Sequence, residues 1–170
     1  DLAPSINVAS VPALASEPLP PPITHLPTPK PVRALYLTGW VAGSSKLRQP
    51  LIDLAERTEI NALVIDIKDY TGRLSFVPND LGLLASGVAE RRIADIEALI
   101  HDLHERGIYV IGRVAVFQDN FSVDKHPELA VRRKSDGEIW RDRKGIPWLE
   151  VGAEPVWDYT VAIAREAHAR

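Results

Sequence analysis

The chain has 170 residues, of which 45% are hydrophobic and 25% charged, and its formal net charge is −3. This composition is ordinary for a globular domain with a buried core, and the charge gives no electrostatic case for nucleic acid binding, which usually requires a basic face. There is no cysteine, which excludes disulfides and thiolate metal sites, and no apolar run reaches the roughly 18 residues of a membrane span. We therefore predict no nucleic acid partner, no membrane span, no metal and no cofactor.

Residues 1–31 are rich in proline, and we predict a disordered linker there. Nine of the 14 prolines fall in this segment, including the run Pro20–Pro22. Proline lacks an N–H donor and breaks helices and paired strands, so such a segment stays extended and unpacked. A proline-motif ligand for a partner protein is the alternative. Linkers of this kind often connect an exported domain to an envelope anchor, and because the chain starts at Asp1 and has no methionine, we expect a processed form or a fragment.

Three short apolar runs after the linker predict β-strands. They are residues 32–40 (VRALYLTGW), 61–68 (NALVIDIK) and 108–117 (IYVIGRVAVF). Each run is rich in β-branched and aromatic residues and is too short for a buried helix.

Apolar residues at helical spacing predict a helix in each gap between these strands. One helix is expected over residues 47–58, with Pro50 in its first turn, because proline is tolerated only there. Another is expected over residues 91–106, where Gly107 provides the stop. A last helix opens around Pro155, since proline suits the first helical position.

The order strand, helix, strand, helix, strand, long loop, helix predicts an α/β domain with a parallel sheet and right-handed crossovers. A (β/α)8 barrel of the TIM type needs roughly 250 residues, and about 140 follow the linker. We therefore predict that residues 32–170 are the N-terminal half of such a barrel, truncated after the helix that follows the third strand. A doubly wound nucleotide-binding domain is the alternative, but residues 39–45 lack the lysine of a phosphate loop.

The functional site of a parallel α/β fold lies at the carboxyl ends of its strands. Alternation along the second strand places Asp66 and Lys68 on the inner face, and Arg113 takes the same face on the third strand. Because an unpaired charge inside a strand costs several kcal/mol, we expect Asp66 to pair with Lys68 or Arg113.

Two interpretations of these charges stay open. They form either a buried ion network that only satisfies itself, or a polar substrate floor in which Asp66 or Asp69 acts as acid or base. Asp69 also starts an ordinary turn sequence. Asp119, which follows the third strand, is a third candidate carboxylate.

A long loop with two tryptophans, residues 118–150, follows the third strand. Loops of this length in compact domains are usually functional or disordered. Trp140 and Trp148 on the loop, together with Trp40 at the end of the first strand, suit stacking against the apolar faces of sugar rings. The alternative is that the two loop tryptophans only anchor the loop to the domain.

These segments resemble the glycoside-hydrolase-like domain family DUF4015, a barrel related in outline to alpha-amylase-type enzymes. The resemblance runs from about Pro31 to Arg170. It rests on motifs in the family order: residues 32–43 (VRALYLTGWVAG), 61–69 (NALVIDIKD) with Gly72, 107–119 (GIYVIGRVAVFQD), 140–148, and 157–167 (WDYTVAIAREA). The sequence departs from the family after Trp148, where residues 149–152 replace an acidic residue, a proline and an aromatic residue.

The resemblance implies a glycoside hydrolase that acts on a polysaccharide, and glycosidases need two carboxylates about 5–10 Å apart. Asp66, Asp69 or Asp119 would supply one, and the family pattern places the other beyond Arg170, so residues 1–170 alone are expected to be inactive. Five residues would bind the substrate: Trp40, Lys68, Arg113, Trp140 and Trp148. A non-catalytic carbohydrate-binding or cell-envelope module of the same fold is the alternative.

Overall fold

Residues 25–170 are described by the computed structural model of the protein. Most of the predicted linker, residues 1–24, lies outside this range. Residues 25–31 contain no helix or strand, yet they lie against the domain. The Thr28 hydroxyl donates to the Tyr109 hydroxyl over 3.2 Å, and the Asn61 side-chain amide donates to the Pro31 carbonyl over 3.0 Å.

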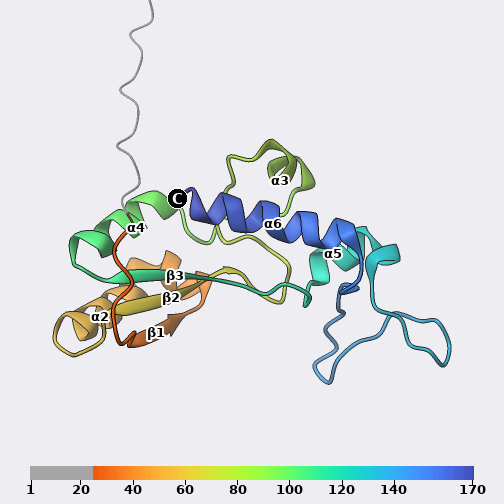
Figure 1. Ribbon diagram of the computed structural model, residues 1–170, viewed down its shortest axis with the longest axis horizontal. Coiled ribbons are helices and arrows are strands. Elements are labelled where there is room, and N and C mark those ends of the chain that lie inside the picture. The colour runs from red at the N-terminus through yellow and green to blue at the C-terminus, as the bar shows by residue number, and fades with distance from the viewer. Residues whose placement is uncertain (1–24) are drawn as a thin grey trace, which may run out of the picture.

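Three parallel strands form the central sheet (Figure 1). The strands are β1 (Ala34–Leu37), β2 (Ala62–Lys68) and β3 (Tyr109–Val114), and they are adjacent in chain order. The register aligns Ala34 with Ala62 and Asp66 with Arg113. The carboxyl ends of the strands therefore meet at one edge of the sheet, where the sequence placed the site.

Helices alternate with the strands, as predicted. Their bounds are α1 (Gly39–Gly43), α2 (Ser45–Glu56), α3 (Leu81–Ser86), α4 (Ile96–Glu105), α5 (Asn120–Lys125) and α6 (Glu154–His168), with a short 3-10 helix at Pro127–Leu129. Figure 1 shows α6 running between the sheet and α3. Glu166 of α6 fixes this arrangement, because its carboxylate accepts from the backbone amides of Asn79 and Asp80 just before α3.

The core lies on the helix-facing side of the sheet, as alternation predicted. The core residues from the strands are Leu37, Leu63, Ile65 and Ile67, and those from the helices include Ile52, Ala55, Leu99, Leu103 and Ile163. Each of them is at most 5% exposed, and burying a large aliphatic side chain stabilises a fold by roughly 1.5–3 kcal/mol. The other face of the sheet is open in the described part of the chain, where Tyr36 is 53% exposed.

The first strand is shorter than predicted and is followed at once by a helix. β1 ends at Leu37, and the Thr38 hydroxyl accepts from the Val41 amide at 3.2 Å as the N-cap of α1. A side chain that satisfies a free N–H of the first turn favours helix over strand. Trp40 therefore lies on α1, so its predicted place at the end of the first strand is wrong.

Other predicted boundaries also shift. The helix predicted from residue 91 begins at Ile96, because Asp95 accepts from the Ala98 amide at 2.8 Å and caps it. α2 begins at Ser45, so Pro50 lies beyond its first turn, contrary to the prediction. β3 ends at Val114 rather than at residue 117.

The long loop of residues 118–150 is folded. It contains α5, the 3-10 helix and four antiparallel bridges, among them Gln118 with Trp148 and Ala130 with Leu149. A second small core lies beneath it, formed by Val123, Ala130, Leu149 and Val156. In Figure 1 the loop extends away from the sheet, beyond α5.

Candidate functional site

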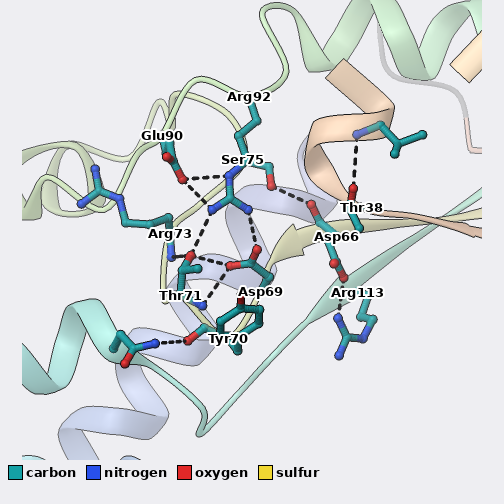
Figure 2. A network of polar contacts seen from close by, with 12 residues as sticks. Thr38, Asp66, Asp69, Tyr70, Thr71, Arg73, Ser75, Glu90, Arg92 and Arg113 are labelled. Carbon is teal, nitrogen blue, oxygen red and sulfur yellow. Dashed lines mark hydrogen bonds and ion pairs between the residues drawn. The ribbon is translucent and has the colours of Figure 1, made fainter. Parts of the chain in front are cut away.

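Asp66 is the centre of a polar cluster on the open face of the sheet. Its Oδ1 accepts from Arg113 Nη1 at 2.6 Å, and its Oδ2 accepts from the Tyr36 hydroxyl. Figure 2 shows the Asp66 and Arg113 side chains pointing toward one another from adjacent strands. The predicted pairing of Asp66 with Arg113 is therefore confirmed.

The carboxylate of this cluster lies beneath its two donors. Asp66 is 2% exposed, whereas the Arg113 side chain is 47% exposed. Burial, with the hydrogen bond and charge of Asp66, raises the pKa of Tyr36, so the phenol keeps its proton. The hydrogen bond to Asp66 raises the pKa of Arg113 in spite of partial burial. A ligand on the open face thus meets a neutral hydroxyl and a cation, with the carboxylate behind them.

Asp69 belongs to a second cluster, just past the end of β2 (Figure 2). Its Oδ1 accepts from the Thr71 amide at 3.0 Å and from the Thr71 hydroxyl at 2.5 Å, which is the turn that the sequence suggested. Its Oδ2 pairs with Arg92 Nη1 at 2.6 Å. Asp69 therefore has both a local turn role and a long-range cation partner.

The environment of Asp69 favours its charged form. Burial on its own would raise the pKa of Asp69, but the hydrogen bonds from Thr71 and Arg92 outweigh burial and lower it. The charge of Asp69 also contributes to the raised pKa values of Tyr36 and Arg113. The Asp66 and Asp69 clusters therefore form one electrostatic unit at the carboxyl end of β2.

Lys68 and Asp119 pair with each other. Lys68 Nζ lies 2.8 Å from Asp119 Oδ2 and donates to the Ala115 carbonyl at 2.6 Å. The pairing of β2 with β3 is irregular between Asp66 and Lys68, and such a bulge re-aims a side chain. The two inner-face charges of β2 therefore have different partners, and Asp66 does not pair with Lys68 as the alternative prediction required.

The Lys68–Asp119 pair is sealed from solvent. The exposed fractions of the two side chains are 1% and 0%. Burial lowers the pKa of Lys68, although Asp119 opposes the shift. Asp119 also caps α5, because its Oδ1 accepts from the Ser122 amide at 2.6 Å. In this conformation a substrate on the open face cannot touch either residue, so their predicted catalytic and binding roles stay predictions.

The loop tryptophans lie together. The rings of Trp140 and Trp148 are 6.0 Å apart between centroids, edge to face at 75°. Trp140 is 38% exposed and lines a groove of about 440 Å³ with Arg133 and Arg141. Trp148 is half-buried, and its Nε1 donates to Asp142 over 3.5 Å. Trp148 thus anchors the loop, whereas Trp140 is available to a ligand.

Sequence reasoning missed two residues of the site. Tyr36 shares the inner face of β1, but only the structure shows that its hydroxyl reaches Asp66. Arg92 was assigned to an amphipathic helix, where arginine is usually exposed. Because α4 begins only at Ile96, Arg92 lies in the segment before the helix, where only 7% of the residue is exposed. The one signal for it in the sequence was Asp95, a capping residue inside the predicted helix.

The described residues show neither metal ligands nor a membrane helix. Within residues 25–170, no three histidine, aspartate or glutamate side chains gather as metal ligands would. No helix in the same range combines the length and the apolar character that crossing a bilayer requires.

Comparison with known proteins places the chain in a family. Residues 34–170 match the family model DUF4015, described as "Putative glycosyl hydrolase domain". Comparison with curated protein sequences finds no match. The crystal structure of a hypothetical protein from Ruminiclostridium thermocellum ATCC 27405 is similar, with 39% identity and a TM-score of 0.71, over 78% of this chain and 69% of that one.

Two glycosidase structures are more distant. A noncanonic maltogenic alpha-amylase, AmyB from Thermotoga neapolitana, is 19% identical with a TM-score of 0.51, over 80% of this chain and 36% of that one. TtGalA, an alpha-galactosidase from Thermus thermophilus, is 21% identical with a TM-score of 0.53, and the match covers 79% of this chain and 28% of that one. At these identities the likeness shows the fold alone, and the predicted α/β architecture, similar to part of a TIM-barrel glycosidase, is confirmed. Because this family model covers most of its length, the chain belongs to the family DUF4015.

Proposed function

We propose that this domain takes part in the hydrolysis of a polysaccharide, with the open face of the sheet toward the substrate and Asp66 as the principal carboxylate. The observation that carries the proposal is the Asp66 carboxylate held between Arg113 and the Tyr36 hydroxyl. It lies near the carboxyl end of β2, where TIM-barrel enzymes place their catalytic groups.

The charges of the site suit this chemistry. Glycoside hydrolysis passes through an oxocarbenium-like transition state flanked by two carboxyl groups. Asp66 and Asp69 supply negative charge, and the exposed Arg113 guanidinium supplies donors for sugar hydroxyls. The Tyr36 hydroxyl donates its proton to Asp66 and can accept from a sugar hydroxyl. The lowered pKa of Asp69 fits a charge-stabilising role better than that of a proton donor. We propose that the proton donor comes from a segment that follows Arg170.

A polymeric substrate is supported by two exposed tryptophans on separate segments of the domain. Trp40 lies on α1 and is 58% exposed, whereas Trp140 lies on the long loop. Aromatic rings stack on the apolar faces of sugars, and two platforms on separate segments suit several sugar units better than one. We propose both as substrate contacts.

A non-catalytic carbohydrate-binding module is the second candidate, and one observation favours it. The three candidate carboxylates Asp66, Asp69 and Asp119 each pair with a cation, and their side chains are at most 14% exposed. Such a self-satisfied network stabilises a fold without chemistry. Its surface would still present tryptophans and hydrogen-bond donors to a glycan.

One experiment separates the two candidates. The chain, expressed with any sequence encoded on either side of it, is incubated with α-glucans, α-galactans and bacterial envelope polysaccharides, and reducing ends and binding are measured in parallel. A hydrolase releases reducing ends from at least one of them and loses this activity in Asp66→Asn. Binding without release supports the module, and neither binding nor release overturns both proposals.

A further inference from the structure

Arg92 is a buried arginine whose guanidinium is fixed on several sides. Its Nη1 donates to Asp69 Oδ2 at 2.6 Å, its Nε to Glu90 Oε2 at 2.8 Å, and its Nη2 to the Thr71 hydroxyl at 3.0 Å (Figure 2). The side chain is 2% exposed. A planar fork held by three partners has little freedom to rotate, so Arg92 is a rigid element of the site.

Trp40 lies against this rigid guanidinium. The Arg92 Cζ atom is 5.1 Å from the centre of the Trp40 ring, within the range of a cation–π contact. More than half of the Trp40 surface nevertheless faces solvent, since its exposed fraction is 58%. The indole is thus supported from within the protein and open to a ligand.

Two glycines bring α1 close enough for this contact. A Cβ atom on Gly43 would lie 1.9 Å from the Arg92 carbonyl oxygen, and one on Gly39 would lie 2.3 Å from Ser75 Oγ. Positions four residues apart share one side of a helix, so this side of α1 rests directly on the segment that carries Arg92. The Ser75 hydroxyl in turn donates to the Asp66 carbonyl at 2.7 Å, which ties the support of α1 to β2.

We infer that Arg92 is a positioning residue that holds Trp40 and Asp69 together as one sugar-binding subsite beside Asp66. The ligand class rests on the proposed function: the indole stacks on the apolar face of a sugar ring, and Asp69 accepts from a ring hydroxyl. Both groups are fixed by Arg92 before the sugar arrives, so binding orders no long side chain at this subsite.

The first test reads the position of Trp40 without any ligand. Trp140, Trp148 and Trp157 are replaced by phenylalanine, which leaves Trp40 as the single tryptophan. Emission and anisotropy of Trp40 are then compared between the parent and Arg92→Met. We expect a shifted emission maximum and a lower anisotropy in Arg92→Met, because the ring loses its support. Unchanged fluorescence overturns the positioning role.

Arg106→Met is the matched control. Arg106 also pairs with two carboxylates, Glu56 at 2.8 Å and Asp102 at 2.9 Å. It lies at the end of α4, at the amino side of β3 and away from Trp40. This variant should leave Trp40 fluorescence unchanged, whereas a change as large as that of Arg92→Met would show a general loss of structure.

The second test measures sugar binding by calorimetry with maltoheptaose and stachyose, using the full-length protein with all four tryptophans of this chain in place. We expect Trp40→Ala to weaken binding about tenfold and Arg92→Met several-fold, while the loss in the double variant is smaller than the two single losses combined, since Arg92 acts partly through Trp40. Arg92→Lys keeps the positive charge but not the planar guanidinium, so its sugar binding should lie between that of Arg92→Met and that of the parent.

The outcomes separate this inference from the proposed function. If the parent binds neither sugar, the subsite is overturned together with that glycan class, and the fluorescence test alone decides the positioning role. If the parent binds and both Trp40→Ala and Arg92→Met bind as tightly, the subsite is overturned while the proposed function stands. Additive losses in the double variant would also overturn it, because Arg92 would then act independently of Trp40.

Discussion

Lys68 Nζ lies 2.8 Å from Asp119 Oδ2, and neither side chain is more than 1% exposed. The pair connects the end of β2 to the first turn of α5, so it attaches the long loop to the sheet. Two buried charges of opposite sign stabilise a fold only while both are present, because the loss of one leaves the other unpaired in the interior.

Removing the cation alone should therefore be costly. We expect Lys68→Met to lower the free energy of unfolding by about 3–5 kcal/mol, measured by urea denaturation. The double variant Lys68→Met/Asp119→Asn removes both charges and leaves an acceptor for the Ser122 amide, so it should recover most of the loss. A double variant as unstable as Lys68→Met would show that packing, and not the unpaired charge, sets the cost.

The acid stability of the domain should depend on Asp69. Its pKa in the folded protein is lowered, below the value of about 3.9 in an unfolded chain. The stabilisation is therefore fully present above about pH 4 and is lost as the pH falls through the folded-state pKa. Asp69→Asn should cost about 1.5–3 kcal/mol at pH 6, typical of a charged hydrogen bond, and progressively less below pH 4.

Denaturation of the parent and of Asp69→Asn across pH 2–7 measures this difference. Asp53→Asn on α2 is the control, because the Asp53 carboxylate accepts from the neutral, exposed Gln49 side chain, and the effect of the replacement should be small at every pH. If the difference in the free energy of unfolding between the parent and Asp69→Asn is constant from pH 2 to 7, the stability of the domain does not depend on the ionisation of Asp69.

The close approach of α1 predicts a steric effect at Gly43. Gly43→Ala adds a methyl group where the Arg92 carbonyl lies 1.9 Å away, so we expect a loss of about 1–3 kcal/mol, as in other overpacked sites. Gly152→Ala is the matched control, since the nearest atom to its added methyl group is 3.8 Å away. Equal stability of the two variants in thermal unfolding would refute the close packing of α1.

The two loop tryptophans should separate binding from stability. Trp140 is 38% exposed, so Trp140→Ala should change the free energy of unfolding by about 1 kcal/mol or less and weaken polysaccharide binding. Trp148 is half-buried beside Trp140, so Trp148→Ala should cost about 2–4 kcal/mol. If Trp140→Ala binds as tightly as the parent, the loop has a structural role only.

Much of the fold can be predicted from the spacing of apolar residues alone. The apolar runs around Leu63 and Val110 and the helical stripes between them predicted the parallel sheet, and alternation on β2 identified which side faces the helices. Boundaries were less accurate, because a single capping side chain decides them. Thr38 caps α1 and so ends β1, and Asp95 caps α4 and so sets its first residue at Ile96. The spacing of apolar residues does not indicate either cap.

The site was predicted in part, for a related reason. Strand alternation places Asp66 and Arg113 on one face, so their pairing could be expected. The Asp69–Arg92 pair joins positions 23 residues apart through an irregular connection, and neither strand nor helical period relates them. The partner of Lys68 depends on the bulge in β2, and no residue in the sequence indicates that a bulge forms there.

If hydrolysis depends on Asp66, the steady-state kinetics of Asp66→Asn in the full-length protein, on the polysaccharide that the parent degrades, will show it. The replacement has the same shape but no charge to pair with Arg113. We predict that kcat falls by about 10²–10⁴-fold with KM changed little, while Asp53→Asn keeps the parental kcat. A folded Asp66→Asn variant with a kcat close to that of the parent would show that Asp66 is not the carboxylate on which hydrolysis depends.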